Sequence, residues 1–120
     1  MIGMGRFGTA IAQRLAEKGA EVIAMDSDRD RIERIRDKVT YAVALDSTDR
    51  EALLSQGIAD MDAVVVSIGE NFQDVLLTTF VLQEIGIKRI IVRESTMPRT
   101  KRKQSGSRSA QFSIMSTPEE

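Results

Sequence analysis

The sequence contains neither cysteine nor histidine, and these two absences disfavour most catalytic and metal-binding chemistry. Without cysteine the chain has no disulfides, no thiolate metal ligands and no thiol nucleophile. Without histidine it lacks the commonest general base and the commonest ligand of transition metals, so hydrolase and zinc-enzyme mechanisms lose their usual groups. No catalytic residue and no metal-binding residue is therefore predicted.

The sequence also lacks an excess of charge and a long hydrophobic run. Its 17 Lys and Arg residues against 18 Asp and Glu residues give a formal net charge of -1, so no bulk attraction to nucleic acid or anionic lipid is expected. No apolar run reaches the roughly 20 residues that span a bilayer. The 120 residues, 42% hydrophobic, suffice for one buried core. We expect a soluble intracellular protein with no nucleic-acid partner.

What the chain does contain, at its start, is the pattern G-x-G-x-x-G formed by Gly3, Gly5 and Gly8. Followed by the helical periodicity of residues 9–18, this pattern is typical of a dinucleotide-binding turn. The first glycine permits a tight turn, the second lets the backbone approach a pyrophosphate, and the third lets the helix pack on the sheet. The unpaired N–H groups at the helix start favour an anion. For the motif alone, a glycine-rich turn without a ligand is the alternative.

Strand and helix patterns alternate along the rest of the chain. Short apolar runs predict strands at residues 21–26, 41–45, 63–67 and 89–93. Amphipathic segments with caps predict helices at residues 29–38 after Asp28, from a capping box at Thr48 and Glu51 to Gly57, and at residues 72–84 before Gly86. This alternation predicts an α/β fold: a Rossmann-like doubly wound parallel sheet in the order 3-2-1-4-5.

Both ends of the chain depart from this plan. A first strand of about four to six residues should precede Gly3, but only Met1 and Ile2 do, so a truncated first strand and a poorly anchored glycine turn are predicted. Residues 94–120 are rich in Ser, Arg and Lys, and within them only residues 111–115 resemble a short strand. We predict a nucleotide-binding domain over residues 1–93 and a divergent basic, flexible tail over residues 94–120.

An acid at the end of the second predicted strand strengthens the interpretation of the glycine motif. Asp26 lies 18 residues beyond Gly8, where an acid in this fold accepts hydrogen bonds from an adenosine ribose. A carboxylate at this place repels a ribose 2′-phosphate and so disfavours NADP. The structural alternative is that Asp26 caps the following helix through Ser27 or Asp28.

Several segments together resemble the RCK/KTN domain of the TrkA N-terminal type. They are residues 3–8, 26–28, 45–48, 66–71 and 90–93, and the resemblance covers roughly residues 2–93. It implies a non-enzymatic cytoplasmic regulatory subunit, peripheral at the inner face of the membrane through a potassium channel or transporter partner. It also implies binding of NAD(H), with ATP or ADP as the alternative, and assembly as homodimers within larger rings.

The resemblance further implies a ligand site built from the turns that follow the strands. The implied cofactor-binding residues are Gly3, Gly5, Arg6, Phe7, Gly8, Asp26, Ser27, Asp46, Ser47, Ser67, Ile68 and Gly69. In this arrangement residues 5–8 hold the phosphates, Asp26 the ribose, and Asp46 and Ser47 the adenine. Residues 67–69 line the crevice on the opposite side.

Some of these side chains allow a second interpretation from their own chemistry. The Arg6 guanidinium could reach a terminal phosphate or be solvated at a helix start. Asp46 could accept a hydrogen bond from the adenine amino group or cap a helix. Phe7 and Phe72 are predicted to be core residues rather than platforms for base stacking.

Two other functions stay open from the sequence. One is the cofactor-binding domain or fragment of an NAD-dependent oxidoreductase, although the chain offers no histidine, no Tyr-x-x-x-Lys pair at its single Tyr41 and no substrate domain. The other is a non-binding interaction fragment, in which the truncated first strand has abolished binding.

Overall fold

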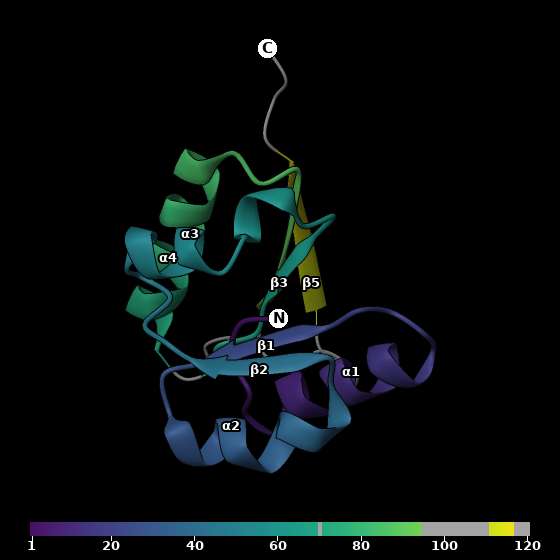
Figure 1. The fold of residues 1–120 in the computed structure, drawn as a ribbon. Coiled ribbons are helices and arrows are strands. Elements are labelled where there is room, and N and C mark those ends of the chain that lie inside the picture. Colours follow the sequence, from purple (N-terminus) through teal and green to yellow (C-terminus); the bar gives the residue numbers. More distant parts are fainter. Residues whose placement is uncertain (70, 95–110, 117–120) are drawn as a thin grey trace, which may run out of the picture.

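A computed structural model describes residues 1–69, 71–94 and 111–116, and its helices and strands alternate as the sequence predicts (Figure 1). The helices are α1 (Arg6–Glu17), α2 (Arg29–Ile35), α3 (Arg50–Ser55) and α4 (Phe72–Ile85), with short 3-10 helices at Arg36–Lys38 and Ile58–Asp60. The strands are β1 (Ile23–Asp26), β2 (Tyr41–Ala44), β3 (Val64–Val66), β4 (Arg89–Glu94) and β5 (Gln111–Ser116). In the described part of the chain, no helix has the length and apolar character needed to cross a membrane.

The strands form two groups that Ile2 connects. β1 pairs with β2 and β3 pairs with β4, both in parallel, while β5 runs antiparallel to β4. Ile2 makes parallel bridges to Met25 of β1 and to Val66 of β3, and backbone hydrogen bonds of 2.7 to 2.8 Å join residues 1–3 to both strands. Because one bridged residue is not a strand, the order 3-2-1-4-5, which counts Met1 and Ile2 as the first strand, stays a prediction.

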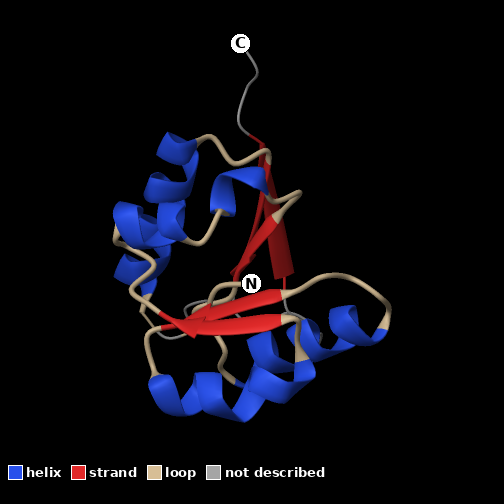
Figure 2. Ribbon diagram, in the orientation of Figure 1, coloured by secondary structure: helices blue, strands red, loops and turns tan. Residues whose placement is uncertain are grey.

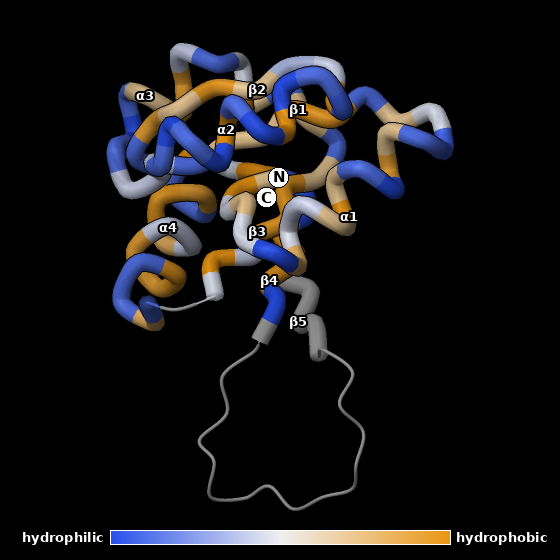
Figure 3. The backbone as a smooth tube through the Cα atoms, turned by 90° about the horizontal axis from the view of Figure 1, so that it is seen from below, coloured by the Kyte–Doolittle hydropathy of each residue, from blue (hydrophilic) through white to orange (hydrophobic). Residues whose placement is uncertain are grey.

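Helices cover both faces of these strands, with α1 and α2 on one side and α3 and α4 on the other (Figure 2). Neighbouring residues of β1 point to opposite faces, so Ala24 and Met25 belong to different buried clusters. Ala24 packs with Ile32 and Ile35 of α2, whereas Met25 packs with Leu82 of α4. Figure 3 shows hydrophobic residues concentrated in the strands and in α4. Each fully buried large aliphatic side chain contributes about 1.5 to 3 kcal/mol, so the two clusters hold the layers together.

The helix ends follow their capping residues, with one exception. Asp28 accepts hydrogen bonds from the first turn of α2, and Gly86, in the left-handed conformation, ends α4, both as predicted. The predicted capping box at Thr48 and Glu51 is wrong. Asp49 caps α3 instead, accepting from the Glu51 N–H at 3.1 Å, because the Thr48 hydroxyl is already bonded to the carboxylate of Asp46.

Two further expectations are wrong, one is confirmed, and one lies partly outside the described residues. The first helix begins at Arg6, three residues earlier than its periodicity predicts. Phe72 is not a core residue: it is the first residue of α4, ahead of the buried part at Thr78, and is 74% exposed. The predicted short strand near residue 111 is present as β5. Residues 95–110 and 117–120 of the predicted flexible tail lie outside the described residues.

Candidate functional site

A cleft of about 830 Å³ lies where the carboxyl ends of the parallel strands meet the start of α1. All the predicted cofactor-binding residues except Gly8 line it: Gly3, Gly5, Arg6, Phe7, Asp26, Ser27, Asp46, Ser47, Ser67, Ile68 and Gly69. The lining also includes residues that were not predicted to belong to the site: Ile2, Ala10, Arg31, Leu45, Thr48, Asn71, Asp74 and Arg93. The strands thus bring together side chains from most of the chain at one edge, as expected for an α/β sheet.

The three positions of the motif hold glycine for different structural reasons. Gly3 has φ +100°, and a Cβ there would lie 2.7 Å from the backbone of Ser67. A Cβ on Gly8 would collide with the carbonyl oxygen of Gly3. Gly5, in contrast, has an ordinary φ of -73°, and a Cβ there would meet only the Arg31 guanidinium, at 4.0 Å. The packing of the described residues therefore requires glycine at positions 3 and 8. At Gly5 it does not, and the space beside this residue is open to the cleft.

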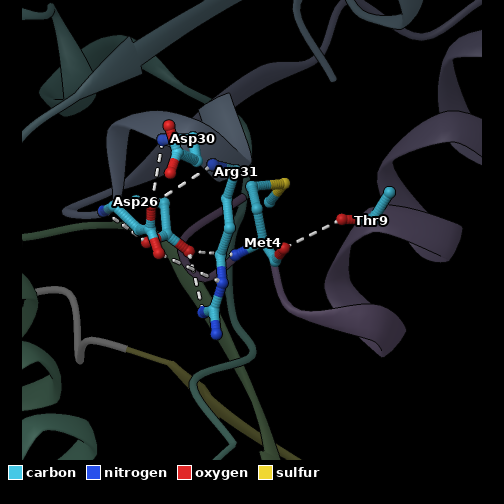
Figure 4. Close-up of polar contacts among 6 residues, drawn as sticks. Met4, Thr9, Asp26, Asp30 and Arg31 are labelled. Carbon is cyan, nitrogen blue, oxygen red and sulfur yellow. Dashed lines mark hydrogen bonds and ion pairs between the residues drawn. The ribbon is translucent and has the colours of Figure 1, made fainter. Parts of the chain in front are cut away.

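Hydrogen bonds anchor the glycine turn, contrary to the expectation from the short first strand. The backbone N–H of Gly3 donates to the carbonyl oxygen of Met25 at 2.8 Å, and that of Met4 donates to Oδ2 of Asp26 at 2.6 Å. The Thr9 hydroxyl of α1 donates to the carbonyl oxygen of Met4 at 2.9 Å (Figure 4). The turn is therefore fixed by β1 and by α1.

Asp26 is the centre of a polar network on the β1 side of the cleft (Figure 4). Its side chain is only 7% exposed, and its Oδ1 accepts the backbone N–H of Asp28 at 2.8 Å. Arg31 lies between two carboxylates, with Nη1 3.6 Å from Asp26 Oδ2 and Nε 3.7 Å from Asp28 Oδ2. The predicted alternative was that Asp26 caps the helix after β1. Asp26 indeed has a structural role at the start of that helix, but the cap of α2 is Asp28. A carboxylate offers about four acceptor positions, so ligand hydroxyls can still be accommodated.

The turn after β2 is also ordered by side-chain hydrogen bonds. Oδ1 of Asp46 accepts both the backbone N–H of Thr48, at 2.9 Å, and its hydroxyl, at 2.7 Å. These two hydrogen bonds hold the pKa of Asp46 below its ordinary value. The hydroxyl of Ser47 lies 2.7 Å from that of Thr78 in α4. Asp46 therefore shapes a turn rather than capping a helix directly.

The β3–β4 side of the cleft contains buried polar atoms without hydrogen-bond partners. Among the described residues these atoms are Oγ of Ser67 and Nε of Arg93. The Arg93 guanidinium stacks 4.0 Å from the ring centroid of Phe7, which is half-buried beside the cleft and not a core residue as predicted. Arg93 follows the last β4 residue that pairs with β3, so it lies at the carboxyl end of a parallel strand, as Asp26 does. Because ligands bind at these strand ends, the rule that predicted Asp26 as a site residue also applies to Arg93.

The start of α1 has the properties of an anion site. Its N-cap is Gly5, which makes no side-chain capping bond, and its first turn holds no acidic residue. The N–H groups of a first helical turn lack partners within the helix and carry partial positive charge. Here that turn includes Arg6 and Phe7, which line the cleft. In the part of the chain that is described, no group of three acidic side chains is placed to hold a metal ion.

Comparison with known proteins gives a family match. The family model of the TrkA-N domain matches residues 1–103 and confirms the resemblance predicted from the sequence. Ktr system potassium uptake protein C of Bacillus subtilis (strain 168) is 44% identical over 93 residues, 78% of this chain and 42% of that protein. Ktr system potassium uptake protein A of the same organism is 39% identical over the same shares. The chain thus spans less than half the length of these curated relatives.

A solved structure confirms the Rossmann-like fold class. The NAD(P)-binding domain of an exopolyphosphatase-related protein from Archaeoglobus fulgidus superimposes with a TM-score of 0.70 and 28% identity, covering 83% of this chain and 74% of that one. A further sequence match, UDP-glucose 6-dehydrogenase of Pseudomonas aeruginosa, is 28% identical over 82% of this chain but over only 26% of that enzyme. That match covers only a small part of the enzyme, as expected if the two proteins share one type of domain.

Proposed function

Since the chain belongs to the TrkA-N domain family, we propose that it binds a nucleotide in the cleft and thereby regulates potassium transport through a membrane partner. The family is one of regulatory domains, and the chain is not an enzyme, as predicted. The observation that carries nucleotide binding is Gly5. Neither its backbone conformation nor its packing requires glycine, and the open space lies at the start of a helix without an acidic residue.

A bound nucleotide supplies ribose hydroxyls at one end and anionic phosphates at the other, and the cleft offers a match for each. The backbone from Gly5 to Gly8 would hold the phosphates, because its N–H groups point out of the helix start. Asp26 would accept the ribose hydroxyls, since Met4 and Asp28 already fix the position of its carboxylate. We place the adenine near Asp46 and Ser47, with residues 67–69 on the opposite wall.

We assign NAD(H) as the ligand, with ATP or ADP as the alternative. The dinucleotide-binding fold of the structural neighbour supports the first, and Asp26 suits the ribose of either. We take residues 1–93 as the binding domain and count residues 1–2 as the first strand of a sheet in the order 3-2-1-4-5.

Regulation follows if the nucleotide binds two conformations of the assembly with different affinities, because only that difference shifts their populations. We propose a homodimer within a larger ring on the cytoplasmic face of the membrane, joined to a potassium channel or transporter. The relatives, which are named as potassium uptake proteins, support this partner class.

Calorimetric titration of the full chain with NADH, NAD, ATP and ADP tests the proposal. We expect saturable binding of at least one nucleotide and no turnover of NADH on prolonged incubation. Absence of binding by all four in a sample with the circular dichroism of a folded α/β protein would refute nucleotide binding. Redox turnover would refute the assignment as a regulatory module.

A further inference from the structure

We infer that Arg93 is a phosphate-binding residue: from the β3–β4 side of the cleft it binds the terminal phosphate of ATP or ADP, beyond the phosphate that AMP also carries, when the nucleotide is held at the glycine turn. This inference rests on the proposed function and deepens it for ATP or ADP, the alternative ligand, because NAD(H) has no terminal phosphate. Arg93 follows the part of β4 that pairs with β3, and it stacks on Phe7 of the first turn of α1. Its charge is thus placed beside the helix start that is assigned to the phosphates.

The position of the guanidinium is defined on two sides. The Phe7 ring lies 4.0 Å away, measured from its centroid to the guanidinium carbon. A Cβ built on Gly69 would lie 3.8 Å from Nη1 of Arg93. Phe7, Gly69 and Arg93 all line the cleft. A guanidinium stacked on an aromatic ring is held in one orientation, so less side-chain entropy is lost when it binds a ligand.

The charge of Arg93 lacks a counter-ion among the described residues, unlike that of the other half-buried arginine at the cleft. Arg31 lies within 3.7 Å of two carboxylates, Asp26 and Asp28. Arg93 has no ion pair with any described residue, and its Nε is buried without a hydrogen-bond partner. Among the described residues this half-buried cation has no anion to offset its lost hydration, and buried donors are normally hydrogen-bonded. An anionic ligand would remove both deficits.

The chemistry of the site selects phosphate among anions. The guanidinium presents a planar fork of N–H donors that matches two phosphate oxygens, and the first turn of α1, which includes Phe7, contributes further N–H groups. Oγ of Ser67, at the end of the neighbouring strand β3, is a second buried group without a partner at the same edge. Two unsatisfied groups on adjacent strands indicate a site that a ligand completes.

The test compares Arg93→Gln with Arg89→Gln in the full chain. Arg89 is an exposed arginine at the opposite end of β4 and does not line the cleft, so its substitution makes the same change of charge on the same strand. Each variant is titrated calorimetrically with ATP, ADP, NADH and AMP. We expect Arg93→Gln to weaken ATP or ADP binding by about 10- to 100-fold, as for loss of a charge-assisted hydrogen bond, with AMP within about twofold of the unchanged chain. Arg89→Gln should match the unchanged chain throughout.

Other results would overturn the inference. Unchanged affinity of Arg93→Gln for ATP and ADP refutes the role of Arg93 while leaving the proposed function intact, whereas a wild-type chain that binds none of the nucleotides refutes both. An equal loss for AMP identifies a merely structural role, and an equal loss for NADH contradicts the assignment to a terminal phosphate. If Arg93→Gln does not fold, Arg93→Lys keeps the charge but not the planar fork. It should still bind ATP more tightly than AMP, and loss of that preference counts against the inference.

Discussion

The two sides of the cleft differ in how completely their polar groups are satisfied. On the β1–α2 side, the Asp26 carboxylate accepts two backbone N–H groups and lies near Arg31. On the β3–β4 side, Ser67 Oγ and Arg93 Nε are buried without hydrogen-bond partners among the described residues. The first side is therefore complete without a ligand and also holds the fold together. The second side is left for a ligand to complete.

This difference matches the two ends of a nucleotide. The completed side presents acceptors, which suit ribose hydroxyls, while the incomplete side presents donors, which suit phosphate oxygens. Substitutions on the two sides should therefore have separable effects. Those near Asp26 should change both folding and binding, and those near Arg93 should change binding alone.

The largest effect is expected between the two sides, at Gly5. We predict that Gly5→Asp lowers ATP or NADH affinity at least about 100-fold, because two like charges 4 Å apart repel by about 4 kcal/mol at an effective dielectric constant of 20. Stability should be unchanged or slightly higher, because aspartate is a better N-cap than glycine. Calorimetry and thermal unfolding measure the two effects. Ala20→Asp adds the same charge at an exposed residue outside the cleft and should bind normally. Wild-type affinity in Gly5→Asp would contradict the phosphate placement.

The free energy of unfolding compares the two sides of the cleft directly, through Asp26 on one side and Arg93 on the other. In Asp26→Asn the new amide NH2 must face either the Met4 or the Asp28 N–H group, and a buried N–H group without an acceptor costs about 1 to 3 kcal/mol. We expect urea unfolding without ligand to show this loss for Asp26→Asn and a change within about 0.5 kcal/mol for Arg93→Gln. Equal losses of unfolding free energy in the two variants would show that the two sides of the cleft contribute equally to folding, contrary to this prediction.

A smaller effect is expected from the aromatic platform under Arg93. Phe7→Leu keeps an apolar side chain but removes the cation–π contact, which contributes about 0.5 to 1 kcal/mol at exposed sites. ATP affinity should fall by about 2- to 5-fold. Phe72→Leu, at an exposed phenylalanine outside the cleft lining, serves as the matched control. If both variants bind as the wild type does, Phe7 does not position Arg93.

The smallest effect concerns the turn after β2. Thr48→Val removes the hydroxyl that bonds to Asp46, so the pKa of Asp46 should rise toward its ordinary value, as measured by NMR titration of the carboxyl carbon. Because the pKa of Asp46 is lowered by folding, its contribution to stability is present above the ordinary value of about 3.9 and is lost as pH falls through the folded value. The acid dependence of unfolding below about pH 4 should weaken slightly in the variant. An unmoved pKa would mean that the hydroxyl is not the main cause.

The sequence allowed much of this arrangement to be predicted, because the relevant signals are local. Strand periodicity and the caps Asp28 and Gly86 located the elements, and the rule that ligands bind at strand carboxyl ends grouped the lining residues. The capping of α3 was misjudged because the Thr48 hydroxyl bonds to Asp46, so Asp49 caps the helix in its place. The burial of Phe72 was misjudged because periodicity does not indicate where packing along a helix stops.

The role of Arg93 could not be predicted in the same way. Its contact with Phe7 joins the last parallel strand to the first helix, and only the folded chain brings them together. The motif glycines illustrate the same limit. The spacing of Gly3, Gly5 and Gly8 is visible in the sequence, but only the structure separates the two that packing requires from the one that leaves space in the cleft.

The most direct test of the proposed phosphate site is a titration of the isotope-labelled full chain with ATP, followed by NMR of backbone amides and arginine Nε–H groups. We predict saturable shifts, with one dissociation constant, for the amides of residues 6–8 and for the Arg93 Nε–H, while the Arg89 Nε–H stays unchanged. Saturable binding that leaves the α1 amides and Arg93 unmoved would contradict this prediction, because the phosphates would then lie elsewhere.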